Sequence, residues 1–236
     1  MKINILTNGF RSPTTRGWLH PLVKNKSRLF EMGIDISFHF KNSEKIKFCD
    51  LVIVESKFVI KKWNLSSGNH TKDNWIKNRS KIFEFLINLK TKDNKVFYYE
   101  LGDSTYSWAL DLLPYVDKLL KPFIFKDKNN YCVPLNGFNI ITDYYYKNGM
   151  IESEEFSSPK FLQEKDKNLL DKIQLGFNSA FADHSLNSNL WKYDYFSRFS
   201  RRFFKIYSTM LNNTKSSEYI DPESSRKQDL SCRISS

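Results

Sequence analysis

The stretch Glu100-Leu-Gly-Asp-Ser-Thr-Tyr-Ser-Trp108 places carboxylates and hydroxyls directly after Lys95–Tyr99, a run typical of a buried strand. Asp103 could act as a general base on an acceptor hydroxyl, with Ser104 and Thr105 as neutral hydrogen-bond donors. The alternative is helix capping, because Asp, Ser or Thr before residues 106–113 would satisfy free backbone N–H groups without any ligand. Residue types alone favour the capping role over the catalytic role. A position at a ligand-binding edge of the sheet would make the two roles more nearly equal.

A second polar loop follows the first strand-like run, Lys2–Thr7. It opens with the turn signal formed by Asn8 and Gly9. Arg11 and Arg16 come next, among small polar residues and just before a helix, where they suit a phosphate or a polyhydroxylated ligand. The alternative is that both arginines solvate a surface loop. His20, beside this loop, either faces the same ligand or is a structural or surface residue.

Several chemistries lack their sequence signatures. No GxGxxG follows the first strand, and no Walker lysine loop occurs in the chain. The four histidines show no HExxH spacing, and the three cysteines have no zinc or disulfide spacing. We therefore expect no metal site and no bound cofactor. The histidines are His20, His39, His70 and His184, and the cysteines are Cys49, Cys132 and Cys232.

Asp143 lies within the aromatic run Ile140–Tyr146. A carboxylate beside tyrosines can hold a sugar ring by stacking and hydrogen bonding. Three consecutive tyrosines are more often part of a partly buried core, so both interpretations stay open.

Alternating strand and helix patterns position these loops. Strand patterns cover residues 2–7, 34–40, 50–55 and 95–99, and helical patterns cover 17–32 and 73–90, with Asp73 as the expected cap of the second helix and Gly33 at the end of the first. This order predicts an α/β domain, a Rossmann-like open parallel sheet flanked by helices. In such sheets ligands bind beyond the carboxyl ends of the strands, where both polar loops would lie.

The second half of the chain is less regular. Pro114 and Pro122 favour a broken helix–strand–helix unit after residue 110, and residues 172–176 form a candidate strand. A C-terminal helix is expected over 189–211, where Phe196–Met210 forms an apolar stripe flanked by basic residues. This stripe could pack on the domain, on a partner chain or on an anionic membrane, and its heptad-like spacing favours packing. Residues 212–236 have the composition of a disordered tail.

The overall composition is that of a globular protein, with 40% hydrophobic and 16% aromatic residues in 236. The net charge of +11 comes mostly from scattered lysines, which argues against a nucleic-acid footprint. No uncharged apolar run reaches 18 residues. We expect a soluble cytoplasmic protein, peripheral to the inner membrane if the Phe196–Met210 stripe binds lipid.

The chain also resembles a known family. The strings MKINILTNGFRSPTTRGWLHPL, CDLVIVESKF, YYELGDST and KIQLGFNSAFADHS, with LLPYVDKLLKPFIFKDKNNYCVPLNGFNIITDYYY, are similar to the N-terminal half of uncharacterised bacterial glycosyltransferases of the two-Rossmann, GT-B type. These proteins occur in surface-polysaccharide gene clusters. The likeness covers most of residues 1–210 and rests on no diagnostic catalytic signature.

The resemblance implies transfer of a sugar from a nucleotide-sugar to a glycan acceptor hydroxyl, without a metal-binding DxD motif. It places the acceptor against Asn8, Gly9, Arg11, Arg16 and the segment Asp103–Thr105, with Asp103 as the candidate base. Domain boundaries follow as 1–188 for the acceptor-side domain, 189–211 for a helix leading to a missing or truncated donor domain, and 212–236 for the tail. Activity of this chain alone is thus in doubt. The alternative is a non-catalytic binding module that works with a partner chain.

Overall fold

The computed structural model describes residues 1–9, 13–63, 65, 71–102, 105–135, 140–151 and 161–176. Its centre is a sheet of six parallel strands in the order β2-β1-β3-β4-β5-β6. The strands are β1 (Lys2–Leu6), β2 (Asp35–His39), β3 (Leu51–Glu55), β4 (Lys95–Tyr99), β5 (Lys118–Lys121) and β6 (Ile173–Leu175). The predicted α/β fold, a Rossmann-like open parallel sheet, is therefore confirmed.

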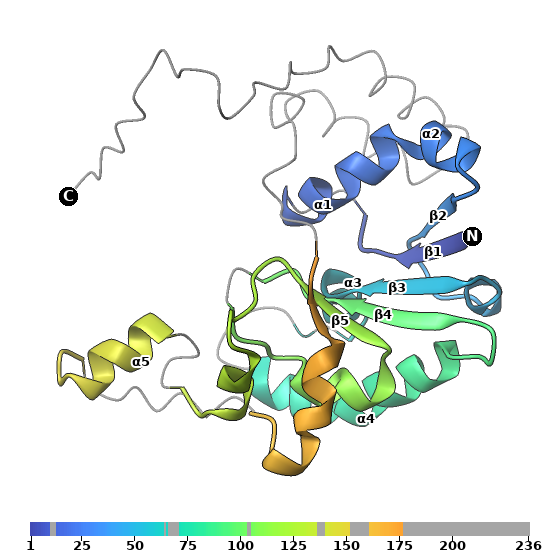
Figure 1. The fold of residues 1–236 in the computed structure, drawn as a ribbon. Helices are drawn as coiled ribbons and strands as arrows, with labels where there is room; N and C mark the ends of the chain where they lie inside the picture. The colour runs from blue at the N-terminus through green and yellow to red at the C-terminus, as the bar shows by residue number, and fades with distance from the viewer. Residues whose placement is uncertain are drawn as a thin grey trace, which may run out of the picture.

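Helices cover both faces of the sheet, with α1 and α2 on one side and α4 on the other (Figure 1). The α-helices are α1 (Pro13–Lys24), α2 (Lys26–Glu31), α3 (Ser56–Lys62), α4 (Thr71–Leu89) and α5 (Ile140–Lys147). Within the described ranges, 3-10 helices connect these elements: η1 (Glu44–Lys47), η2 (Leu110–Tyr115), η3 (Lys128–Cys132) and η5 (Glu164–Lys172). Helix α5 projects away from the sheet and the helices that cover it (Figure 1).

Two apolar clusters form, one on each face of the sheet. The smaller joins Trp18, Leu19 and Val23 of α1 to β1 and to Tyr99. The larger lies beneath α3 and α4 and extends to η2 and η5. Successive residues of β1, β3, β4 and β5 pack into opposite clusters, as expected of parallel strands that are buried on both faces.

Several local predictions are corrected by the structure. The single helix expected over 17–32 is two helices that meet at Asn25, where Asn25 N–H donates to the Pro21 carbonyl at 3.1 Å. Helix α4 begins at Thr71, so Asp73 lies inside its first turn instead of capping it. Gly33 does adopt the left-handed conformation, with φ of 80°, just after α2. The predicted helix at 189–211 and tail at 212–236 lie outside the described residues.

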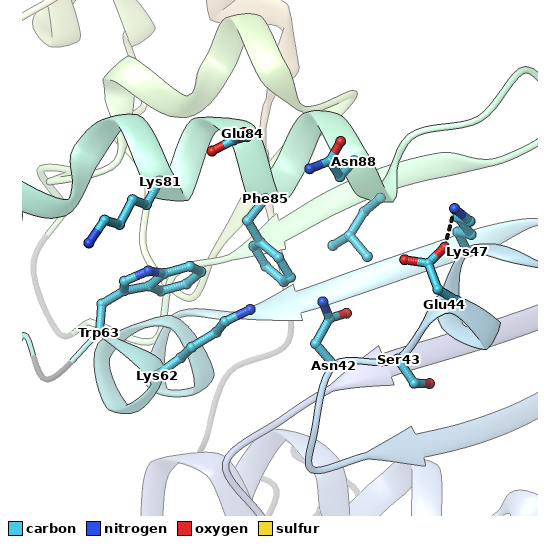
Figure 2. A pocket seen from close by; sticks show the side chains of 11 residues that line it. Asn42, Ser43, Glu44, Lys47, Lys62, Trp63, Lys81, Glu84, Phe85 and Asn88 are labelled. Carbon is cyan, nitrogen blue, oxygen red and sulfur yellow. Dashed lines mark ion pairs between the residues drawn. The ribbon is translucent and has the colours of Figure 1, made fainter.

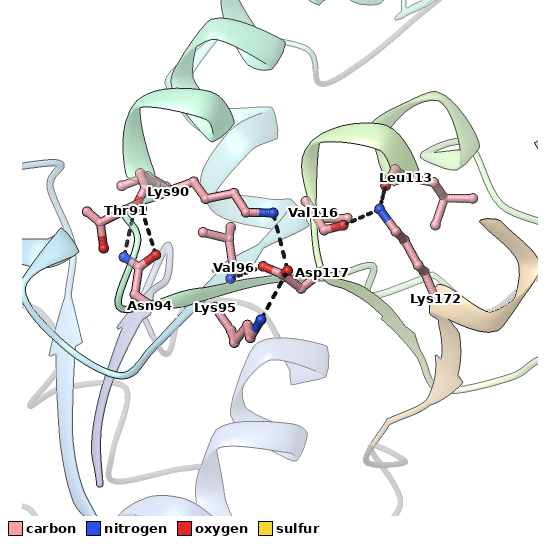
Figure 3. A network of polar contacts seen from close by, with 10 residues as sticks. Lys90, Thr91, Asn94, Lys95, Val96, Leu113, Val116, Asp117 and Lys172 are labelled. Atoms are coloured by element: carbon pink, nitrogen blue, oxygen red, sulfur yellow. Dashed lines mark hydrogen bonds and ion pairs between the residues drawn. The ribbon is translucent and has the colours of Figure 1, made fainter. Parts of the chain in front are cut away.

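Polar contacts fix the amino ends of β4 and β5 (Figure 3). The Asp117 carboxylate accepts hydrogen bonds from Val96 N at 2.8 Å and from Lys90 Nζ at 3.2 Å. Partial burial acts to raise the pKa of Asp117, but these two donors outweigh it and hold the pKa below its ordinary value. The Lys172 ammonium donates to the Leu113 and Val116 carbonyls at 2.7 and 2.9 Å. This end of the sheet is therefore locked by structural contacts.

Candidate functional site

The strand order creates a switch point between β1 and β3. From β1 the chain crosses in one direction to β2 and later in the other direction to β3 and the remaining strands. In open α/β sheets such a reversal leaves a crevice beyond the carboxyl ends of the two central strands, and ligands bind there. The residues that follow β1 and β3 are Thr7, Asn8, Gly9 and Ser56, with Glu55 ending β3.

Glu55 ties this edge together from a fully buried position, with a relative exposure of 0%. Its carboxylate accepts hydrogen bonds from the hydroxyls of Thr7, after β1, and Thr15, in the first turn of α1. It also accepts one from the backbone N–H of Asn8 at 3.2 Å. Burial raises the pKa of Glu55 above its ordinary value, and the hydrogen bonds counteract this only in part. Glu55 thus positions the loop without contacting solvent.

The loop that Glu55 holds includes Asn8 and Gly9, which follow β1 at the carboxyl edge of the sheet. Gly9 adopts φ of 85°, a conformation that side chains disfavour, and its N–H donates to Thr7 Oγ1 at 3.2 Å. The buried Oδ1 of Asn8 has no hydrogen-bond partner among the described residues. The same holds for Nε1 of Trp18, on α1, a side chain that is only 2% exposed. One unsatisfied acceptor and one unsatisfied donor therefore belong to the elements that flank the switch point, and buried polar groups normally have partners.

A second buried carboxylate, Glu100, explains the polar stretch after β4. It forms an ion pair with Lys121 Nζ at 2.9 Å, and the two side chains are 9% and 1% exposed. Glu100 also accepts hydrogen bonds from Ser107 Oγ at 2.5 Å and from Trp108 N at 2.9 Å. Lys121 donates in addition to the Tyr106 carbonyl at 2.7 Å. Glu100 and Lys121 therefore fold residues 106–108 back onto the end of β5.

Tyrosines surround the two carboxylates. Burial raises the pKa of Tyr99, and the negative charge of Glu55 adds to the effect. Burial likewise raises the pKa of Tyr106, with Glu100 as the next cause. Tyr99 packs edge-on against Trp18 with ring centroids 4.7 Å apart. These phenols stay protonated at neutral pH and act as packing and hydrogen-bonding groups.

Among the predicted site residues, Asn8 and Gly9 lie at the carboxyl edge as expected. Thr105 is half-buried, and its backbone carbonyl accepts a hydrogen bond from Tyr131 Oη at 2.8 Å. Arg16 and His20 belong to α1, although their side chains lie outside the described part of the chain. Arg11, Asp103 and Ser104 also lie outside it. Neither the catalytic nor the capping role of Asp103 is therefore tested, and both stay predictions.

The aromatic run 140–146 forms α5, where the Asp143 carboxylate is buried and pairs with Lys147 at 2.7 Å. Tyr144, Tyr145 and Tyr146 are exposed by 56%, 43% and 37%, so they do not form a core. The alternative of a tyrosine core is thus corrected: the projecting helix turns these rings outward.

Two features bear on cofactors and membranes. No group of His, Cys, Asp or Glu side chains within the described ranges is arranged to hold a metal ion. Across these same ranges, the longest helices lack the length and apolar character needed to span a bilayer.

The described elements define the class of the protein as an open, Rossmann-like parallel α/β domain whose strand order reverses between β1 and β3. Comparison with known proteins adds no narrower identity, because no family model, curated protein or solved structure matches the chain.

Proposed function

We propose that this chain is a glycosyltransferase-like acceptor-binding domain that takes a hydroxyl-rich glycan acceptor in the crevice between β1 and β3. One observation carries the proposal: Asn8 Oδ1 is a buried acceptor without a partner among the described residues. Separate hydroxyl groups can donate to Asn8 Oδ1 and accept from Trp18 Nε1, because each hydroxyl has one donor and two acceptor sites. A sugar ring offers several such hydroxyls.

The composition of the loop after β1 favours binding of a glycan acceptor over binding of a nucleotide-sugar donor. Glycine-rich loops at helix N-termini are a common means of holding the phosphates of nucleotides and dinucleotides. Here Gly9 stands alone in the loop after β1, and the next glycine is Gly17, inside α1. Transfer of a sugar would require a nucleotide-sugar site from another domain or chain. Asp103 stays the proposed general base for such a reaction.

A glycan array tests the proposal directly. The full 236-residue chain should retain a subset of neutral oligosaccharides, whereas UDP-glucose and GDP-mannose should show no binding in calorimetry. Asn8→Ala should weaken the retained signals about tenfold, the size of a lost buried hydrogen bond. Asn148→Ala, at the exposed end of α5, is the matched control. An empty array, or equal binding by both variants, would contradict acceptor binding at this crevice.

The second candidate is a non-catalytic module that acts through a partner chain. It is favoured by the exposed apolar and aromatic residues on and after α5: Ile140, Ile141, Tyr144, Met150 and Ile151. Apolar surface of this kind commonly marks a protein interface. Loss of a partner on Ile141→Asp, with unchanged glycan binding, would favour this alternative. The Phe196–Met210 stripe, the other proposed contact, lies outside the described residues.

A further inference from the structure

A cavity of about 430 Å³ lies on the α4 side of the sheet, away from the residues of the crevice. It is enclosed by the loop leading into η1, the end of α3 and one side of α4 (Figure 2). Its volume lies within the range of sites that hold small molecules, roughly 300 to 1,000 Å³. Its lining includes none of the switch-point residues Thr7, Asn8, Gly9, Glu55 and Ser56. The lining residues used below are Asn42, Ser43, Lys62, Lys81, Glu84 and Asn88.

The charges around this cavity leave one net positive charge. Glu44 and Lys47 neutralise each other in an ion pair. Lys62, Lys81 and Glu84 form no ion pair with another described residue. The remaining lining charges are therefore two ammonium groups and one carboxylate, and a ligand with a single negative charge would balance them.

The Lys62 ammonium is the best-placed group to meet that charge. It lies 4.7 Å from the centroid of the Trp63 ring and 4.1 Å from that of Phe85. Figure 2 shows Lys62 extending toward Phe85, with the Asn42 amide directed into the same space. The two rings cover part of the ammonium, and this loss of hydration lowers the pKa of Lys62. An anion would restore a partner to this cation, since aromatic faces offer it only a weak one.

We propose that this cavity binds a small hydroxylated monocarboxylate of the sugar-acid class. The carboxylate would pair with Lys62, and the amides of Asn42 and Asn88 with the hydroxyl of Ser43 supply donors and acceptors for hydroxyl groups. The Trp63 ring offers an apolar wall to a sugar face. Glu84 and the balance of one positive charge disfavour a phosphate dianion. The proposal is independent of the crevice and of acceptor binding there.

Isothermal titration of the full chain with glucuronate tests this proposal. We expect saturable binding of glucuronate, with glucose and glucose 6-phosphate each at least about tenfold weaker, since each lacks the matched single charge. Absence of glucuronate binding at millimolar concentration would overturn the proposal. Equal binding of glucose would also overturn it, because charge would then play no part. Tighter binding of glucose 6-phosphate would overturn the choice of a monocarboxylate.

Variants then locate the bound ligand. Lys62→Gln should weaken glucuronate binding roughly tenfold or more, the size of a lost charge-assisted hydrogen bond. Lys61→Gln is the matched control, since Lys61 precedes Lys62 on α3, is exposed and does not line the cavity. Asn8→Ala should leave glucuronate binding unchanged. Equal losses in Lys61→Gln and Lys62→Gln, or a loss in Asn8→Ala, would place the ligand elsewhere and overturn the assignment.

Discussion

At the scale of single residues, Glu55 links the two strands of the switch point through its carboxylate. Burial raises the pKa of Glu55 above its ordinary value of 4.5. Between these two pKa values the folded protein binds more protons than the unfolded chain, so the free energy of unfolding falls as the pH rises through this window. The titration of Glu55 therefore works against folding at neutral pH, while the hydrogen bonds it accepts hold the loop.

Glu55→Gln should remove this contribution. The amide oxygen of Gln can accept from Thr7 and Asn8 N, and its NH2 group can donate to the Thr15 hydroxyl, so we expect a cost of less than about 1 kcal/mol at acidic pH. Above pH 4.5 the free energy of unfolding should fall less steeply than in the wild type. Urea denaturation across this range measures the slope, with Glu31→Gln at the exposed end of α2 as the control. Identical slopes in both variants and the wild type would show that Glu55 does not titrate there.

The buried ion pair between Lys121 and Glu100 allows a second prediction about the free energy of unfolding. Lys121→Met leaves the Glu100 carboxylate buried without its cation, and such a loss costs about 3–5 kcal/mol. The double variant Glu100→Gln with Lys121→Met should be more stable than Lys121→Met alone, because no buried charge is left. Chemical denaturation compares them with Lys118→Met, a half-exposed lysine in the same strand. A decrease of less than about 1 kcal/mol in the free energy of unfolding of Lys121→Met would contradict a buried ion pair.

At the scale of elements, the close approach of β6 to β4 and β5 depends on Gly176. A Cβ atom there would lie 2.7 Å from Cε2 of Tyr99 and 3.3 Å from Cβ of Leu120. Tyr99 cannot easily move aside, because it is only 1% exposed and packs against Trp18. The end of β6 therefore tolerates no side chain at this position.

Gly176→Ala should destabilise the fold by about 1–3 kcal/mol, the usual cost of overpacking. Gly102→Ala is the matched control, since a Cβ atom there meets nothing within 4 Å. Thermal unfolding of both variants checks the difference. A Gly176→Ala protein as stable as the control would mean that β6 does not dock as described.

Some of the helices and strands could be predicted from the sequence and others could not. Buried aliphatic runs such as Leu51–Glu55 revealed the strands, because few other structures bury both faces of a short segment. Helix α3 was missed since Ser56 follows the strand without a turn or cap signal. Lys121 was missed as well, because its pairing with Glu100 depends on the alignment of β4 and β5, which no local pattern encodes. Asn8 and Gly9 could be predicted, since a turn after the first strand must lie at the ligand edge.

At the scale of the whole molecule, the two edges of the sheet have different roles. The amino edge carries the Asp117 and Lys172 contacts that join strands to helices. The carboxyl edge carries buried carboxylates that hold loops in place, and at the switch point it leaves Asn8 Oδ1 without a partner among the described residues. Polar contacts therefore stabilise both edges, and the unsatisfied Asn8 acceptor lies at the switch point, where α/β sheets commonly bind ligands.

The central claim is that a hydroxyl-rich ligand occupies the crevice between β1 and β3. Hydrogen–deuterium exchange of the full chain, with and without a mixture of neutral di- to tetrasaccharides, tests it most directly. We predict slower exchange in peptides that contain Asn8, Gly9 and Ser56, with little change in those that cover α5 or residues 81–89. Unchanged exchange at Asn8 and Gly9 under saturating oligosaccharide, or protection confined to other segments, would contradict the claim.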